Sequence, residues 1–296
     1  MAVIGRNKLV EKLLSDPRID TRIKLENYLT VELGLRPCSQ ATIPFDLVNA
    51  QRLGSEIDQR IYPQIISIEK IVDTREKLRA IEAIKREMSK AFREIVEASQ
   101  EYSALIEWTE ALRLRRAVFQ VRPTVQEIFF FKEKNIEKKL KELLKDREKI
   151  RTTALRGFQQ GADKVRFVYP EEFNKNWLRR MGELLGYPSC CVERYAEERA
   201  EGISVEERSA TQIREKAESD LNVLSYFVAY FFPCSPDCKE AISKGESIYN
   251  ELSKLDLRIG EAYKRIVKEN SERVRCQPEI LAEYSQKVIE AQRKYR

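Results

Sequence analysis

Residues 80–112, AIEAIKREMSKAFREIVEASQEYSALIEWTEAL, contain neither glycine nor proline, and they decide the expected fold. Their apolar residues recur at alternating steps of three and four, which is the spacing of a coiled-coil seam. This spacing predicts a long helix whose apolar stripe needs a partner. The seam comprises Ile81, Ile84, Met88, Ala91, Ile95, Ala98, Tyr102, Leu105 and Leu112, with Thr109 as a polar interruption.

Two kinds of partner satisfy such a stripe. The helix can pack against neighbouring helices of its own chain, or it can pack against a second copy of the chain. A charge-rich chain with few such helices favours the second arrangement, so we expect a homodimer, and the first stays open. The expected dimer seam consists of Ile81, Ile84, Met88, Ile95, Tyr102, Leu105 and Leu112.

The composition outside this stretch also favours helices. The chain has 296 residues, of which only 10 are glycine and 10 are proline, and 34% are charged. Residues 64–122 and 124–156 contain neither glycine nor proline. We therefore expect a mostly α fold with three parts. These are an N-terminal region of short helices and turns (1–63), a long helical hairpin (64–160) and a C-terminal helical region that carries most of the cysteines (161–296).

A break in the middle of the hairpin is expected at Pro123. Thr124 and Glu127 have the spacing of a capping box, which predicts that a second helix begins there and continues through three phenylalanines, residues 129–131. One face of this helix should carry Ile136, Leu140, Leu143, Arg147 and Ile150. Before the break, the mostly apolar residues 117–121 could form a short strand instead of a helix.

The absence of histidine narrows the possible chemistry. The sequence has no histidine at all, so it excludes a Ser-His-Asp triad, a Cys-His pair, a histidine base and a histidine-ligated metal. Glycine-rich nucleotide-binding motifs and the nucleophile elbow of hydrolases are also missing. Paired glutamates fall in predicted first turns, where the helix dipole explains them. We expect no catalytic residue and a binding protein rather than an enzyme.

Positive charge gathers in one part of the chain. The net charge is +6, and residues 111–156 hold 14 basic and 6 acidic residues, a local excess of eight. A dense basic segment beside aromatic residues suits contact with a nucleic-acid backbone. The alternative is a solvated helix face with internal ion pairs. The expected RNA or ribonucleoprotein contacts are Arg113, Arg115, Arg116, Arg122, Lys132, Lys134, Lys138, Lys139, Lys141, Lys145, Lys149 and Arg151.

Four of the six cysteines form two pairs. GYPSCCVERY contains Cys190 and Cys191, and FPCSPDCKEA contains Cys234 and Cys238. Both pairs are expected at helix N-termini, where the helix dipole stabilises thiolates. The spacing differs from that of zinc knuckles, so an iron–sulfur cluster, zinc, a disulfide and inert packing all remain open. The sequence shows no secretory signal and no apolar run of membrane-spanning length, so we expect a cytoplasmic protein with reduced thiols.

Three resemblances extend this interpretation. The vicinal pair followed by a later pair resembles the cysteine-rich iron–sulfur domain of heterodisulfide reductases, from which it departs at Val192, where glycine is expected, and in the last spacing. The two blocks resemble the GYP-x-CC and P-C-x-x-D-C signature of an archaeal family of unknown function, which assigns no chemistry to the cysteines. In overall character the chain is similar to the archaeal ribosome dimerisation factor.

The last resemblance implies a homodimer that joins small ribosomal subunits or blocks subunit joining. Together with the basic segment, it leads us to expect a non-catalytic protein that binds the small ribosomal subunit or another structured ribonucleoprotein. No small-molecule substrate is evident. The competing hypothesis is an iron–sulfur or thiol-based redox protein centred on Cys190, Cys191, Cys234 and Cys238.

Overall fold

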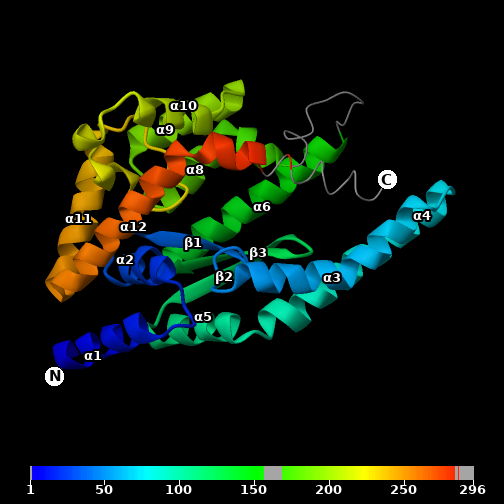
Figure 1. The fold of residues 1–296 in the computed structure, drawn as a ribbon, viewed down its shortest axis with the longest axis horizontal. Coiled ribbons are helices and arrows are strands. Elements are labelled where there is room, and N and C mark those ends of the chain that lie inside the picture. Colours follow the sequence, from blue (N-terminus) through cyan, green and yellow to red (C-terminus); the bar gives the residue numbers. More distant parts are fainter. Residues whose placement is uncertain (1, 157–168, 284–285, 287–296) are drawn as a thin grey trace. The chain divides into compact units, whose positions relative to one another are not determined.

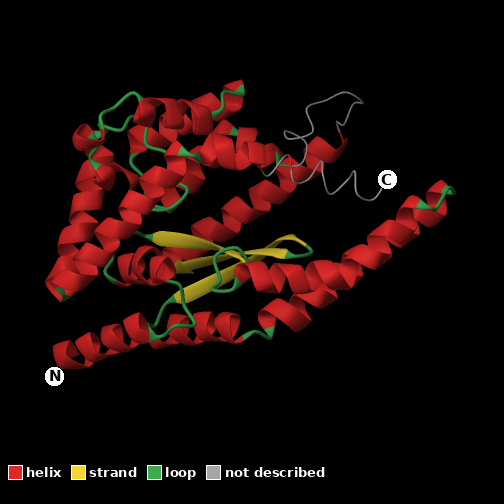
Figure 2. Cartoon of the chain, in the orientation of Figure 1, coloured by secondary structure: helices red, strands yellow, loops and turns green. Residues whose placement is uncertain are grey.

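Helices make up most of the computed structural model, which describes residues 2–156, 169–283 and 286 (Figure 2). The mostly α class is therefore confirmed. Contacts divide the chain into two compact units. Of the described residues, unit 1 comprises 2–32 and 39–132, and unit 2 comprises 33–38, 133–156, 169–283 and 286. The division at residue 132 differs from the boundaries expected at 63 and 160, the second of which lies outside the described residues.

Unit 1 is built from helices and a small sheet (Figure 1). Its core is formed by buried side chains such as Tyr28, whose hydroxyl donates to the Leu105 carbonyl at 2.6 Å, and Phe130, whose ring meets Tyr28 edge-on. The helices are α1 (Ala2–Ser15), the π-helix η1 (Ile23–Leu29), α2 (Thr30–Glu32), α3 (Ala50–Glu69), α4 (Thr74–Phe92), the π-turn η2 (Arg93–Glu97) and α5 (Gln100–Ala111).

The long glycine-free stretch forms several helices rather than one. Helix α3 continues through Pro63, so the expected boundary lies inside a helix. The next two helices begin at side-chain caps: Asp73 accepts a hydrogen bond from the Glu76 amide, and Ser99 accepts one from the Tyr102 amide. These caps satisfy first-turn amides that would otherwise lack a partner. New helices therefore begin at Thr74 and Gln100 although neither glycine nor proline precedes them there.

A β-hairpin replaces the second helix expected at Thr124. Strands β2 (Arg115–Arg122) and β3 (Val125–Phe131) pair antiparallel, with Ala117 opposite Phe129, and β1 (Cys38–Ile43) completes a sheet of order β1-β3-β2. The prediction of a helix there was wrong, and the alternative of a strand at 117–121 is confirmed. The aromatic run 129–131 is fully buried on β3. Bulky aromatic side chains favour strands, and this preference outweighed the capping-box spacing.

Apart from Cys38, the first residue of β1, the regular elements that the structure describes in unit 2 are helices. Its first helix buries Ile136, Leu140, Leu143 and Arg147, the face expected from the sequence. The elements are α6 (Lys134–Arg156), η3 (Pro170–Phe173), α8 (Lys175–Leu184), α9 (Ser189–Glu201), α10 (Val205–Arg214), η4 (Glu218–Asp220), η5 (Val223–Tyr226), α11 (Lys239–Leu255) and α12 (Leu257–Arg275).

The sequence predicts one helix from a Ser204 cap to residue 232 and another over 246–272 with Gly260 as its weak point, and the observed helices differ from both. Helix α10 begins after the Ser204 cap as expected but ends at Arg214 instead of continuing to residue 232. The long helix expected over 246–272 is interrupted at Asp256 rather than at Gly260. The Asp256 side chain accepts from the Arg258 amide at 2.8 Å and thereby starts α12. Gly260 instead lets α12 approach α11, because a Cβ there would meet Ser253.

None of the described helices combines the length and the apolar character that crossing a membrane requires.

Candidate metal centre

The first turn of α9 carries one pair of cysteines. Pro188 is the N-cap residue, and its carbonyl accepts hydrogen bonds from the amides of Cys191 and Val192, both at 3.0 Å. This start confirms the helix N-terminus expected for the pair. Cys191 is buried, with 1% of its surface exposed, whereas Cys190 is exposed. The centre therefore has one side that faces the interior and one that faces solvent.

The loop before α11 carries the second pair. Cys238 is the N-cap residue of α11 and is buried, and Cys234 lies four residues earlier in irregular chain and is partly buried. Of this pair, only Cys238 therefore stands at a helix N-terminus. The position of Cys234 depends on the loop, which makes a tight turn in which the Cys238 amide donates to the Ser235 carbonyl at 3.0 Å.

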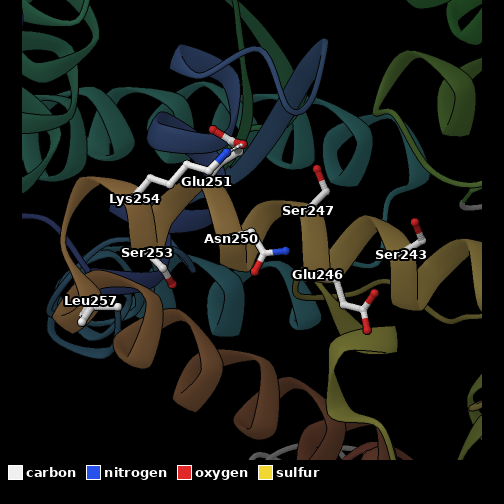
Figure 3. A pocket seen from close by; sticks show the side chains of 8 residues that line it. All are labelled: Ser243, Glu246, Ser247, Asn250, Glu251, Ser253, Lys254 and Leu257. Atoms are coloured by element: carbon white, nitrogen blue, oxygen red, sulfur yellow. Dashed lines mark hydrogen bonds and ion pairs between the residues drawn. The ribbon is translucent and has the colours of Figure 1, made fainter.

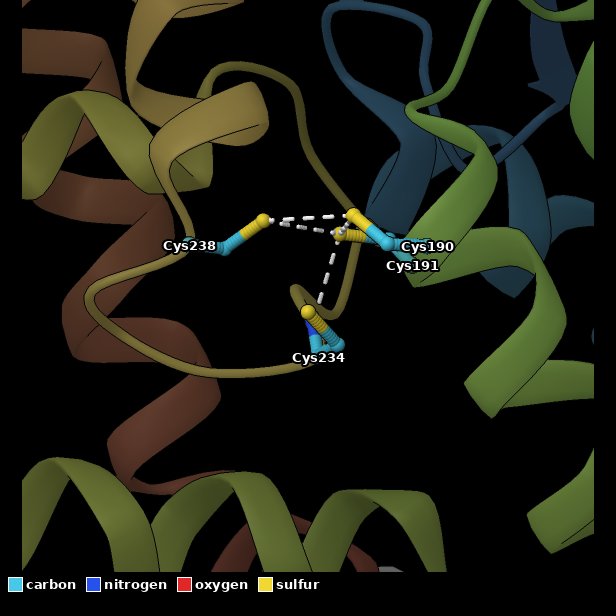
Figure 4. Close-up of side chains that lie close together, drawn as sticks. All are labelled: Cys190, Cys191, Cys234 and Cys238. Atoms are coloured by element: carbon cyan, nitrogen blue, oxygen red, sulfur yellow. Dashed lines mark hydrogen bonds between the residues drawn. The ribbon is translucent and has the colours of Figure 1, made fainter.

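The four sulfur atoms converge in unit 2 (Figure 4). The Cys238 sulfur lies 3.5 Å from each of the sulfurs of Cys190 and Cys191, which are 3.9 Å from each other. The Cys234 amide donates to the Cys191 sulfur at 3.4 Å. All four sulfurs lie within 4.8 Å of one another. Two segments separated by more than 40 residues thus form one cluster that can bind a metal.

The surroundings of the sulfurs shift the pKa values of the thiols in different directions. Burial raises the pKa of Cys190 to about 11 and raises the pKa of Cys191 further. Burial acts in the same direction on Cys238, but the Ala241 amide and hydrogen bonds from the neighbouring thiols outweigh it and lower the pKa of Cys238. Four adjacent thiolates repel one another, so a cation is the natural counterpart that lets all of them ionise.

The spacing of the sulfurs favours a single ion over a cluster. Zinc bound tetrahedrally by four thiolates at about 2.3 Å places the sulfurs about 3.8 Å apart. A four-iron cluster binds each thiolate to a different iron and therefore separates the sulfurs more widely. None of the six cysteines, all of which are described, forms a disulfide. The sulfurs of Cys190, Cys191 and Cys238 are 3.5–3.9 Å apart, and the Cys234 sulfur lies within 4.8 Å of them, which fits the single ion better than the cluster.

Comparison with family models gives one match. Residues 111–259 match the model of a family described as a protein of unknown function, DUF483. The matched segment covers half of the chain. The chain belongs to the DUF483 family. Comparisons with curated proteins and with solved structures give no match.

The segment that identifies this DUF483 protein includes every residue of the metal centre. It also includes β2, β3 and α6, over which the predicted basic contacts are distributed. The family description assigns no activity, so the chemistry of the centre has to be inferred from its geometry.

The basic residues of the DUF483 protein do not form one helical arm. Those of unit 1 lie at or on the sheet: Arg113 follows α5, Lys132 follows β3, and the strand β2 carries Arg115, Arg116 and Arg122. All five are exposed. Lys132 donates to the Glu32 carbonyl, and Arg116 pairs with Glu110. The expected helical hairpin is wrong in this part of the chain, because residues 115–131 form the β-hairpin of β2 and β3.

The remaining basic residues lie on α6 in unit 2. Arg151 is bound by the buried Glu171 in a bidentate ion pair, so it serves the packing of η3 on α6. Lys141 and Lys149 pair with Glu137 and Asp146. The other four predicted contacts on this helix, all exposed, are Lys134, Lys138, Lys139 and Lys145.

The predicted dimer seam follows α4, η2 and α5. It is interrupted at Ser99, where α5 begins. Some residues of this seam are buried and therefore pack inside unit 1, and the others are half-buried. Ile84, Leu105 and Leu112 are buried, and Ile81, Met88, Ile95 and Tyr102 are half-buried.

Unit 2 also has a polar groove along α11 (Figure 3). It has a volume of about 700 Å³. Lys254 and Glu251 in this groove form an ion pair within a single turn of α11. The lining offers hydroxyls, an amide and carboxylates but no thiol, and it supports no chemistry comparable to that of the sulfur cluster. It consists of Ser243, Glu246, Ser247, Asn250, Glu251, Ser253, Lys254 and Leu257.

Three charged residues beside the metal centre were missed at the sequence level. Arg194 and Arg208 donate to carbonyls of the loop that carries Cys234, and Glu198 binds both arginines. Alternating arginine and glutamate is common on solvated helices, so the sequence offered no signal that sets these residues apart.

Proposed function

We propose that this DUF483 protein binds one zinc ion through the thiolates of Cys190, Cys191, Cys234 and Cys238, and that the ion stabilises unit 2. The observation that carries the proposal is the convergence of four sulfurs within 4.8 Å. Four protein ligands leave no open position for a substrate, and zinc has no redox chemistry, so the role of such a site is structural. Reduced thiols and this role agree with a cytoplasmic location.

The ion would join two parts of unit 2 that are distant in sequence. One pair of ligands comes from α9 and the other from the loop that leads into α11. Binding free energies for structural zinc are about 10–16 kcal/mol in zinc-finger peptides. An ion bound with even part of that free energy would fix the loop against α9 and so order the surface around it.

Metal analysis tests this proposal. Cells are grown with zinc and iron, the protein is purified anaerobically without chelators, and both metals are measured. We expect one zinc per chain and a colourless protein. The Cys190→Ser variant should lose the zinc, whereas Cys276→Ser should keep it; both cysteines are exposed, so the two variants are matched. Brown protein with iron would support the iron–sulfur hypothesis instead, and metal-free wild-type protein would contradict both.

A second proposal, that the protein binds a ribonucleoprotein, is favoured by a line of lysines on α6. Five exposed lysines follow one another at steps of four, three, four and four, which places them on one side of the helix, opposite its buried face. With a rise of 1.5 Å per residue, the line is about 22 Å long. These residues are Lys134, Lys138, Lys141, Lys145 and Lys149.

A straight line of cations suits a phosphate backbone rather than base-specific contact, because each neutralised phosphate releases counterions whatever the sequence. We propose the small ribosomal subunit as the partner, with dimerisation of subunits or a block to subunit joining as the consequence. The protein would act as a homodimer through its predicted seam, which sedimentation tests: a particle of twice the chain mass supports the dimer, and a monomer assigns the seam to packing within unit 1.

Co-sedimentation with ribosomal subunits tests the contact. The wild-type protein should pellet with small subunits at low salt and dissociate as salt rises. The double variant Lys138→Glu/Lys145→Glu should lose this association. The control Lys239→Glu/Lys264→Glu changes the net charge equally at exposed positions of α11 and α12, and it should still pellet. Equal losses in the two variants, or no pelleting of the wild type, would contradict the proposal.

A further inference from the structure

The loop of residues 233–238 needs external support to place Cys234. No helix or strand includes this residue. Within the loop, the Asp237 amide donates to the Ser235 hydroxyl at 3.2 Å, and Asp237 forms an ion pair with Lys216 at 2.5 Å. These contacts fix the end of the loop near Cys238. They leave the beginning of the loop to be held by other groups.

Two arginines hold that beginning. Arg194 on α9 donates from Nη1 to the carbonyl of Cys234 at 2.8 Å. Arg208 on α10 donates from Nη1 to the carbonyl of Pro233, also at 2.8 Å. Consecutive peptide groups are thus bound by guanidinium groups from two different helices. Together with the hydrogen bond from the Cys234 amide to the Cys191 sulfur, these contacts fix the backbone on both sides of the Cys234 Cα atom.

One carboxylate aligns both arginines. Glu198 accepts from Arg194 Nε at 2.7 Å through Oε1, and from Arg208 Nη2 and Nε at 2.8 and 3.1 Å through Oε2. The side chains of Glu198 and Arg208 are only 10% and 13% exposed. Ion pairs at this depth are screened far less by solvent than surface pairs, and breaking one leaves a charge without its partner.

We infer that Glu198, Arg194 and Arg208 are positioning residues of the metal centre, which hold Cys234 close enough to the other three cysteines for all four sulfurs to bind one ion. This inference rests on the zinc proposal above. The charge of these three side chains also suits the metal centre. One carboxylate and two guanidinium groups carry a net charge of +1, and the four thiolates with a divalent ion carry −2. Groups that orient metal ligands in this way affect metal affinity although they never touch the ion.

The affinity for zinc, measured by competition with a chelator, tests the inference. Glu198→Gln and Arg208→Gln should weaken zinc binding about 10- to 100-fold, the range typical of residues that orient ligands. Arg208→Lys keeps a donor and should recover part of the loss. The matched control is Arg199→Gln, since Arg199 also joins α9 to α10, through Glu206, but its partners Glu206 and Tyr195 lie outside the cysteine loop.

A second readout separates positioning from general stability. Cobalt(II) substituted for zinc reports tetrahedral sulfur coordination by its absorption, which should change in Glu198→Gln and Arg208→Gln but not in Arg199→Gln. If either of the first two variants does not fold, Arg194→Gln takes its place, because this side chain is 43% exposed and loses its hydrogen bond to Cys234 with less disturbance.

The outcomes distinguish the two proposals. Wild-type protein that binds no zinc overturns the zinc proposal itself. Wild-type protein that binds zinc, with affinity and cobalt absorption unchanged in the positioning variants or changed equally in Arg199→Gln, overturns only the role of the three positioning residues.

Discussion

The Asp16 carboxylate joins the turn that follows α1 to α5. It accepts hydrogen bonds from the amide, Nε and Nη2 of Arg18, at 2.9–3.1 Å, and from Trp108 Nε1 at 2.8 Å. The Arg18 guanidinium, helped by Trp108, holds the pKa of Asp16 well below its ordinary value of 3.8, although burial acts the other way. A depressed carboxylate pKa means that the ionised form stabilises the folded chain.

Replacing Asp16 by asparagine should therefore destabilise unit 1 near neutral pH. We expect Asp16→Asn to lower the free energy of unfolding by about 1.5–3 kcal/mol at pH 7, the range for hydrogen bonds to charged groups. The contribution of Asp16 is present above about pH 4 and is lost as the pH falls toward its folded-state pKa, so the difference between variant and wild type should shrink on acidification.

Denaturant unfolding followed by Trp108 fluorescence measures this difference. A Trp177→Phe background leaves Trp108 as the only tryptophan. Asp58→Asn, exposed on α3, is the control and should leave stability unchanged. A difference between Asp16→Asn and wild type that stays constant from pH 7 to pH 3 would show that the charge of Asp16 plays no part.

At the scale of the elements, local patterns predicted helix faces well and helix ends less well. The buried face of α6 and the starts of α9 and α10 follow from side-chain spacing and capping residues. The break before α4 also had a local signal, because Asp73 and Glu76 have capping-box spacing, whereas Thr124 and Glu127 have the same spacing inside a hairpin. Spacing alone cannot distinguish a helix start from a hairpin turn. At Thr124 the burial of the phenylalanines on β3 favours the hairpin.

The approach of α11 to η5 depends on Gly245. A Cβ at this position would lie 2.1 Å from the Leu224 carbonyl oxygen, and a backbone atom cannot rotate away. Gly245→Ala should therefore destabilise unit 2 by about 1–3 kcal/mol, as overpacking usually does. Gly54→Ala on α3 is the control, because a Cβ there meets nothing within 4 Å and alanine is the better helix former.

Thermal unfolding measures both glycine variants. Gly245→Ala should lower the midpoint of unfolding, and Gly54→Ala should leave it equal or raise it. Equal midpoints for Gly245→Ala and the wild type would mean that η5 and α11 do not approach as closely as the structure shows.

At the scale of the whole molecule, the sequence identified the four cysteines but not the geometry that favours one ion. Their grouping in two pairs was visible, because each pair lies in one short block. Whether the sulfurs meet depends on how α9 and the loop before α11 pack, and on Arg194 and Arg208, whose partners are carbonyls that no sequence pattern marks. The basic segment was visible as a charge excess, but its division between two units depends on the hairpin.

Zinc at a tetrathiolate site should also change the response of the protein to chelators. Removal of the ion breaks the four bonds that join α9 to the loop before α11, so the chelated wild-type protein should unfold at lower temperature than the holoprotein. Adding zinc back should restore the midpoint. The Cys190→Ser variant should show no response to either treatment, and an equal response in this variant would assign the effect to a different site.

Native mass spectrometry of the anaerobically purified chain tests the single-ion centre most directly, because it weighs the metal together with the protein. We predict a mass increment of one zinc ion for each chain, absent from Cys190→Ser and present in Cys276→Ser. An increment that corresponds to several irons with inorganic sulfide, or the bare mass of the chain, would contradict the account.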